Sequence, residues 1–186
     1  MIKGFLLVFL MFALTLIAEA SNGLNIKNEN IMTTKMIESA YKKVGTAKFS
    51  VLFWDIYQST LYTPSGSYSS ESQPETLVFK ITYLKDISAE NLLERTIEQW
   101  QHLKIPEKSY EAFIPALEKL WPNIRAGDTL TLHLKDEQSL FYYNDEYIGL
   151  VDEKEFGQLF LSIWLSPDTS QRNLRAELIG NTKNEE

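Results

Sequence analysis

The chain contains no cysteine, so disulfide bonds, thiol chemistry and cysteine metal sites are excluded. It has only two histidines, His102 and His133, and no H-E-x-x-H sequence, which argues against a metal or haem site. The phosphate-binding loops G-x-x-x-x-G-K-[ST] and G-x-G-x-x-G and the hydrolase sequence G-x-S-x-G are also missing. The sequence therefore predicts no metal, no other cofactor and no familiar catalytic set.

Positive charge is scarce as well. The chain has 18 Lys and Arg but 25 Asp and Glu, which gives a net charge of −7. Nucleic acid binding needs clustered Lys and Arg against the phosphates, so we expect no nucleic-acid partner. The acidic residues between Asp145 and Glu155 lack EF-hand spacing and are typical of a solvated face.

The chain has a single long apolar run, Phe5 to Ile17. It follows Lys3 and precedes Ala18-Glu19-Ala20, the pattern of a signal peptide cleaved after Ala20. We expect residues 1–20 to be a signal peptide and the mature protein to be periplasmic or secreted. Since no Cys follows, a lipoprotein anchor is excluded, but an uncleaved membrane anchor stays open. No second apolar run predicts an integral membrane domain after cleavage.

The remainder reads as one domain between polar ends. Residues 21–43 are expected to be a polar leader, in which Lys35–Lys43 could form either a short helical turn or a strand. Residues 44–180 form the predicted domain, and residues 181–186 a polar tail. The sequence carries no repeat and no signal for an oligomeric state.

Strand patterns come in two groups. The first is a long β-branched and aromatic stretch from Thr46 to Thr63, which a bulge or a hairpin should interrupt, followed by Thr76–Leu84. The second comprises three short strands over 129–134, 140–143 and 147–151, with a tight turn at Asn144-Asp145.

Helical patterns follow each strand group. Ser88 is a predicted N-cap, and a second helix is expected over residues 110–121. After the last strand, an apolar stripe predicts a helix over residues 156–164. A final helix is expected to begin at Ser166-Pro167 and to end at Gly180. The order predicts an α+β fold with a largely antiparallel sheet.

One charge stands out within the first strand stretch. If VLFWDIYQSTLYT were continuous strand, Asp55 would share a face with Tyr57, while Trp54 and Tyr62 would share the other. A buried tyrosine hydroxyl needs a hydrogen-bond partner, and Asp55 could supply one to Tyr57. The alternative is that Asp55 binds a turn or a backbone N–H.

Four stretches together resemble the bacterial chalcone isomerase-like family: VGTAKFSVLFWDIYQSTLYTP (44–64), AGDTLTLHL (126–134), FYYNDEYIGLV (141–151) and FGQLFLSIWLSPDTSQRNLRAELIG (156–180). The resemblance implies an open-faced β-sandwich, in which a long antiparallel sheet is backed by a layer of helices. It also implies a cleft between sheet and helices, which holds a chalcone in the plant isomerases and a fatty acid in their plastid relatives.

The resemblance carries over only part of the isomerase site. The plant enzymes bind the phenolate with an Arg on an early strand. Here Lys48 is the best match for that Arg, and Tyr57 falls near the position of the strand hydroxyl. The helical Tyr and Asn of that site have no clear match in NLLERTIEQWQHL. We therefore expect no chalcone isomerase activity.

Three hypotheses follow. The first is a protein that binds a small amphipathic ligand, such as a fatty acid or an aromatic acid, with Lys48, Asp55 and Tyr57 at its head and Trp54, Trp100 and Tyr62 lining the cleft. The second is an isomerase or lyase that acts on an unsaturated ketone or acid by general acid–base chemistry, with Tyr57 as the acid and Lys48 as the clamp. The third is an interaction module whose own side chains fill the cleft.

Two arginines on the last helix, Arg172 and Arg175, are three residues apart and share a face. A structural role, in the helix dipole or in pairs with acidic residues, is favoured over ligand contact.

Overall fold

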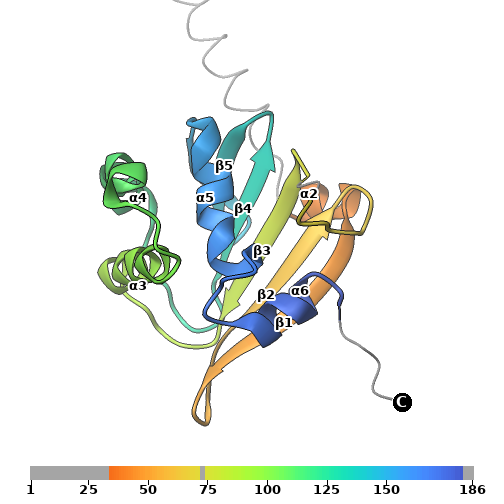
Figure 1. Ribbon diagram of the computed structural model, residues 1–186, viewed down its shortest axis with the longest axis horizontal. Coiled ribbons are helices and arrows are strands. Elements are labelled where there is room, and N and C mark those ends of the chain that lie inside the picture. Colours follow the sequence, from red (N-terminus) through yellow and green to blue (C-terminus); the bar gives the residue numbers. More distant parts are fainter. Residues whose placement is uncertain (1–33, 72–73, 182–186) are drawn as a thin grey trace, which may run out of the picture. The chain divides into compact units, whose positions relative to one another are not determined.

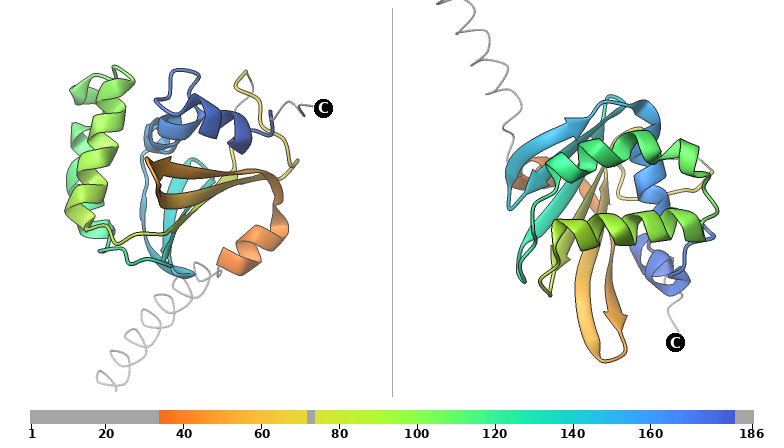
Figure 2. Two further views of the ribbon diagram at one scale, coloured as in Figure 1. Left: turned by 90° about the horizontal axis from the view of Figure 1, so that it is seen from below. Right: turned by 90° about the vertical axis from the view of Figure 1, so that its left-hand side faces the viewer.

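The computed structural model describes residues 34–71 and 74–181. The predicted signal peptide, most of the predicted leader and the tail beyond Asn181 lie outside the described residues. The described residues form an α+β unit with one antiparallel sheet and helices on both of its faces (Figures 1 and 2).

Six strands form the sheet, and each pairs with the next along the chain (Figure 1). They are β1 (Lys42–Val51), β2 (Trp54–Thr63), β3 (Leu77–Tyr83), β4 (Thr129–Lys135), β5 (Gln138–Tyr143) and β6 (Glu146–Val151). The helices are α2 (Thr34–Ala40), α3 (Ala89–His102), α4 (Ile114–Leu120), α5 (Lys154–Leu165) and α6 (Arg172–Leu178). The fold predicted from the sequence, a long antiparallel sheet backed by helices, is confirmed.

The main core lies between the sheet and helices α3 to α6 (Figure 2). Strand β4 shows how the alternation builds it, because Leu130, Leu132 and Leu134 are all buried on that side. Aromatic rings fill the space between the layers. Phe79 on the sheet packs on Trp164 of α5 with 4.7 Å between ring centroids, and Phe141 packs on Phe160 at 5.8 Å.

A smaller core lies on the opposite face of the sheet, under α2. Ile37 is buried there beside Val78, and Lys80 forms a half-buried ion pair with Glu38 at 2.8 Å. Residues 34–43 fell within the predicted leader. In the structure they form helix α2 and the first two residues of β1, so both structures considered for Lys35–Lys43 occur in succession.

Two tight turns connect neighbouring strands of the sheet. Asn144 and Asp145 adopt φ values of 47° and 71°, which confirms the tight turn expected there and fits type I′. The long strand stretch is divided by a hairpin at Leu52 and Phe53, and β2 also carries a bulge, so both kinds of interruption considered from the sequence occur.

Two of the predicted helices begin later than expected. The segment 107–113 forms two short 3₁₀ helices, and α4 starts only at Ile114. Pro115 explains the delay, since proline is tolerated in the first turn of a helix and disrupts its interior. Ser166 does not cap α6. It follows the end of α5, and its hydroxyl accepts from the Asp168 N–H at 3.1 Å, so α6 begins at Arg172.

Other helix ends agree with the sequence. The Ser88 hydroxyl accepts from the Asn91 N–H, which confirms the N-cap of α3. Gly180 has φ of 73° and donates to the Glu177 carbonyl, while Asn181 donates to the Ala176 carbonyl. This pair of bonds is a Schellman motif, and it confirms the helix end expected at Gly180.

The end of α6 lies directly against β1 at Gly45. A Cβ atom at this position would lie 2.6 Å from the Leu178 carbonyl oxygen and still closer to that of Glu177. Both neighbours are backbone atoms, which cannot rotate away. Only glycine therefore allows this approach of helix to strand.

We expect Gly45→Ala to lower the free energy of unfolding by about 1–3 kcal/mol, the usual cost of forcing extra volume into a packed site. Urea titration followed by circular dichroism measures the change. Lys43→Ala, an exposed change on the same strand, is the matched control. Equal stabilities for the two variants would contradict the close contact.

His133 makes stability depend on pH. Burial, with a smaller effect of Lys135, lowers the pKa of His133 from 6.5 to about 4, and its Nε2 lies 2.8 Å from the Tyr41 hydroxyl. Between pH 4 and pH 6.5, His133 is protonated in the unfolded chain and neutral in the folded chain. Stability from this group is therefore full above pH 6.5 and falls as pH drops toward 4.

We expect the wild type to lose up to about 3 kcal/mol of stability from this group between pH 7 and pH 4. Carboxylates titrate in the same range, so the loss is read as the difference from His133→Gln in urea titrations at each pH. A difference that stays constant with pH would contradict the buried neutral imidazole.

Candidate functional site

The polar side chains singled out in the first hairpin form an ion pair at its surface. Lys48 Nζ lies 2.9 Å from Asp55 Oδ2, and the Ser50 hydroxyl donates to Asp55 Oδ1 at 2.7 Å. The bonds from Lys48 and then Ser50 lower the pKa of Asp55, so this carboxylate is ionised at neutral pH. Both charged side chains are about half-exposed, and the pair faces solvent.

A bulge separates this pair from Tyr57. Phe49 pairs with Tyr57, but Ser50 pairs with Asp55, so Ile56 is an extra residue in β2. Because side chains alternate with a period of two, one inserted residue moves Asp55 to the other face of the sheet from Tyr57. The expected contact between Asp55 and Tyr57 is replaced by the contacts of Asp55 with Lys48 and Ser50.

Tyr57 instead points toward the main core. Its ring packs against Phe49 at 5.2 Å and Tyr83 at 6.1 Å between centroids. Its hydroxyl accepts a hydrogen bond of 2.9 Å from Trp164 Nε1 on α5. The bond joins residues 107 positions apart in the chain and fastens the helix layer to the sheet.

The setting of Tyr57 determines its chemistry. Burial raises its pKa to about 12, against the smaller opposing effect of the Trp164 bond. Burial also raises the pKa of neighbouring Tyr83. The Tyr57 phenol therefore stays protonated at neutral pH and can donate its hydrogen. Together with the indole N–H of Trp164 it provides two donors, 2.9 Å apart, in an aromatic surrounding.

The remaining predicted site residues lie in separate places. Trp100 is fully buried on α3, where it stacks on Tyr110 at 5.0 Å and donates to the Leu159 carbonyl. Tyr62 lies on the opposite face of the sheet, in the smaller core under α2. Trp54 is 61% exposed at the end of the hairpin. The six predicted residues therefore do not converge on one cleft.

Trp164 is the functional candidate that sequence reasoning did not single out. It appeared only as one member of the apolar stripe of α5. Its tryptophan identity could have signalled a polar role, because a buried indole N–H needs an acceptor.

The structure gives Arg175 a structural role, but its bonds are with a carbonyl and a hydroxyl rather than with the acidic residues considered from the sequence. Its Nε donates to the Leu165 carbonyl at 2.8 Å and its Nη2 to the Ser70 hydroxyl at 2.7 Å. Arg172 lines a cavity of about 410 Å³ with His102 and the polar loop 168–171.

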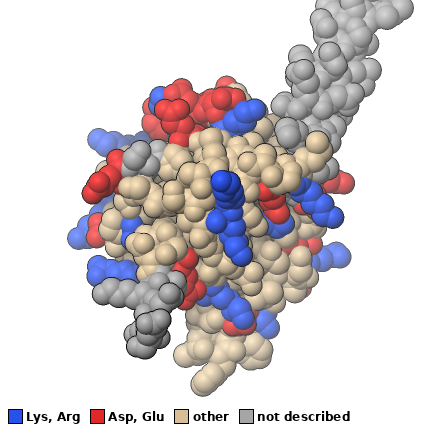
Figure 3. Space-filling view, turned by 90° about the vertical axis from the view of Figure 1, so that its right-hand side faces the viewer, with Lys and Arg blue, Asp and Glu red and all other residues tan. Residues whose placement is uncertain are grey.

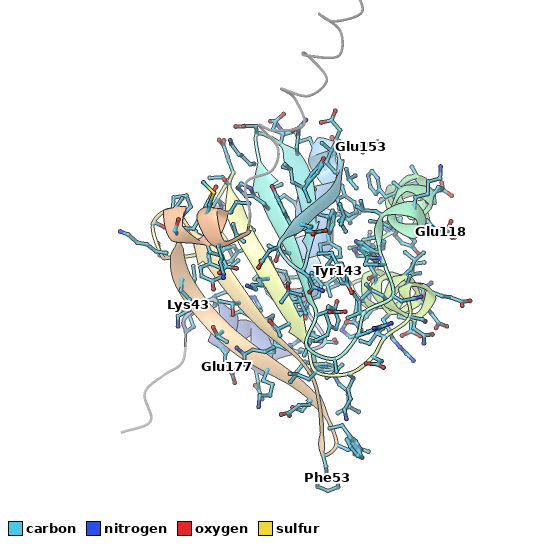
Figure 4. The ribbon with its side chains drawn as sticks, turned by 180° about the vertical axis from the view of Figure 1, so that it is seen from behind. Lys43, Phe53, Glu118, Tyr143, Glu153 and Glu177 are labelled. Carbon is cyan, nitrogen blue, oxygen red and sulfur yellow. The ribbon has the colours of Figure 1, made fainter. Side chains whose placement is uncertain are left out.

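A larger surface groove of about 830 Å³ lies between α3 and α4. Leu93, Ile97 and Ile114 provide its apolar lining, and four carboxylates also line it: Glu90, Glu94, Glu98 and Glu118 (Figure 4 labels Glu118). Carboxylates repel an anionic head group, so this groove is a poor place for a fatty acid.

Within residues 34–71 and 74–181, no helix is long and apolar enough to cross a bilayer. No group of three or more His, Asp or Glu side chains in the same ranges could hold a metal ion.

Fold and sequence together define the class. The protein is an α+β domain with a six-stranded antiparallel sheet backed by helices, and the sequence profile of the chalcone isomerase-like family matches residues 25–180. The chain therefore belongs to the chalcone isomerase-like family, as its sequence motifs indicated.

Two individual proteins show how far the similarity extends. An uncharacterized protein of Haemophilus influenzae is 24% identical over 143 residues, which cover 77% of this chain and 70% of the relative. A crystal structure of a fatty-acid binding protein of Arabidopsis thaliana matches with a TM-score of 0.59 and 11% identity, over 76% of this chain and 88% of that one. At that identity the match establishes the shared fold.

We expect Tyr57→Phe to destabilise the folded state by about 1–3 kcal/mol, because the indole N–H of Trp164 stays buried without its acceptor. Urea titration at neutral pH measures the loss. Tyr62→Phe, the same change on the opposite face of the sheet, is the control. A Tyr57→Phe variant no less stable than the control would contradict the hydrogen bond.

Proposed function

We propose that this protein binds a small amphipathic acid, a fatty acid or an aromatic acid, between the sheet and the helices, with Tyr57 and Trp164 holding the carboxylate. The observation that carries the proposal is the pair of hydrogen-bond donors in an aromatic interior. A carboxylate can accept from both the phenol O–H and the indole N–H, and such charge-assisted bonds are stronger than the neutral bond they replace.

The surroundings suit the rest of such a ligand. Phe49, Tyr83 and Phe79 present apolar ring surface next to the donor pair. Because these rings and Trp164 pack on one another, a bound ligand has to displace part of this packing. Binding then exchanges one set of apolar contacts for another, while the carboxylate separates Trp164 from Tyr57.

The fold supports the same proposal. The Arabidopsis protein that shares this fold is a fatty-acid binding protein. Since one fold serves many functions, the similarity adds weight only in combination with the donor pair.

An isomerase or lyase is the weaker alternative. A general acid works best when its pKa lies near the working pH. A phenol with a pKa of about 12 is far from that range. The proposed clamp, Lys48, is paired with Asp55 on the other face of the sheet.

We also propose that the protein is exported and acts in the periplasm or outside the cell. The support is the sequence of residues 1–20, with its Lys, its apolar run and its A-x-A site.

The first experiment expresses the full-length gene in a bacterial host and examines the purified protein by native mass spectrometry. An intact mass that begins at Ser21, in protein recovered from the periplasm, supports export. An uncleaved mass that begins at Met1, in protein recovered from the cytoplasm, would refute it. A bound fatty or aromatic acid released by solvent extraction supports the ligand class.

The second experiment tests the site by titrating the protein with palmitate and, as a neutral probe, hexadecanol. Tyr57→Phe should weaken palmitate binding about tenfold, since it removes a charge-assisted hydrogen bond. Hexadecanol, which lacks the carboxylate, should be much less affected. Lys48→Gln is the control and should bind palmitate as the wild type does. Equal palmitate affinity for Tyr57→Phe and the wild type would refute the proposed site.

A further inference from the structure

The hairpin between β1 and β2 ends in four consecutive apolar side chains that project from the sheet (Figures 3 and 4). Val51, Leu52, Phe53 and Trp54 are 48%, 87%, 97% and 61% exposed. We call these four residues the hairpin tip. Figure 3 shows the end of this projection free of Lys, Arg, Asp and Glu, and Figure 4 labels Phe53 at its extremity.

Folding does not account for this composition. The tip is a two-residue turn, in which Leu52 has φ of 54° and occupies the first central position. Glycine is the preferred residue there, because a side chain crowds the backbone at positive φ. Leu52 therefore adopts an unfavourable backbone conformation and leaves its side chain in water. Neither its backbone conformation nor its exposed side chain stabilises the fold, so Leu52 points to a binding role.

The residues behind the tip have a definite order. Trp54 forms its base, and the Lys85 ammonium lies 4.4 Å from the centre of the Trp54 ring. Behind them comes the ion pair of Lys48 with Asp55. The polarity therefore rises in three steps: apolar side chains, then a tryptophan with a cation, then paired charges. The environment of a bilayer changes in the same order, from the hydrocarbon through the head groups to water.

We propose that the hairpin tip docks this protein on a lipid bilayer, with Leu52 and Phe53 in the acyl chains and Trp54 and Lys85 among the head groups. The tip is a convex projection, which a fluid bilayer accepts without a matching hollow. Its four side chains fall short of the roughly 800 Å² that each partner of a stable protein interface buries. A second copy or another protein is therefore the less favoured occupant.

The charges predict which membrane is bound. Lys48 is neutralised by Asp55, Lys85 lies over Trp54, and the whole chain carries a net charge of −7. Attraction to anionic lipid should be weak, so binding should occur on phosphatidylcholine alone and change little with salt. The proposal goes beyond ligand binding, and its test uses no fatty acid.

The test uses Trp54 as its own probe. The chain has four tryptophans, and the other three, Trp100, Trp121 and Trp164, are 0%, 4% and 8% exposed. Vesicles of phosphatidylcholine with brominated acyl chains should therefore quench the emission of Trp54 selectively. The full chain, purified as the cell makes it, is compared with Trp54→Phe, and the difference isolates Trp54. Every variant has the same N-terminus, so a contribution from residues 1–33 cancels.

Leu52→Gly and Phe53→Ser should each weaken vesicle binding about tenfold or more, the effect of removing one large apolar side chain from the membrane. Leu52→Gly should fold at least as stably as the wild type, since it relieves the turn, so lost binding cannot be ascribed to misfolding. Met36→Ser removes an exposed apolar side chain from α2, before the start of β1, and should leave binding unchanged.

Quenching of Trp54 that disappears in Leu52→Gly and Phe53→Ser supports the proposal. Vesicle binding without quenching of Trp54, or binding unchanged in both variants, would overturn it. So would a wild-type dimer, seen by light scattering without vesicles, that Phe53→Ser converts to a monomer, because the tip would then serve a second copy.

Discussion

The packing of α5 across the sheet is the interaction on which helices α3 and α6 depend. Its apolar stripe fills the main core, with Trp164 on Phe79, and its backbone carbonyls fix its neighbours. The Leu159 carbonyl accepts from Trp100 of α3, and the Leu165 carbonyl accepts from Arg175 of α6. Leu165 is the last residue of α5, and the last carbonyls of a helix have no partner within it, so the Arg175 donor stabilises this end. The Trp100 donor instead fixes α3 against the middle of α5.

The same helix defines the candidate site. Tyr57 becomes a protonated donor in an apolar place because α5 covers it and supplies the indole N–H. The bulge at Ile56 places an apolar site and a charged site on opposite faces of one strand. Tyr57 faces the aromatic interior, whereas Asp55, two residues earlier, faces water with Lys48. The interior serves the proposed ligand, and the hairpin beyond the bulge serves the proposed membrane contact.

Sequence reasoning succeeded where local rules decide the outcome. Ser88 caps its helix, Asn144-Asp145 forms its turn, and Gly180 ends the last helix, because each depends on the backbone preference of one or two residues. It was less successful where a nearby residue competes. Pro115 delays α4, and Ser166 bonds to the Asp168 N–H rather than starting α6. The contact of Asp55 with Tyr57 was expected by assuming an uninterrupted strand, which the bulge at Ile56 breaks.

The sequence by itself determined the α+β class, the family, the strand order along the chain and the presence of a hydroxyl at Tyr57. These follow from periodicity, turn residues and motifs, which act over short distances. Only the tertiary structure decided which side chains meet. One inserted residue moves the side chains that follow it to the other face of the sheet. The hydrogen-bond partner of Tyr57 lies on a helix, 107 residues later in the chain. The register of strands and the docking of helices are set by packing of the whole chain, and a local pattern does not contain them.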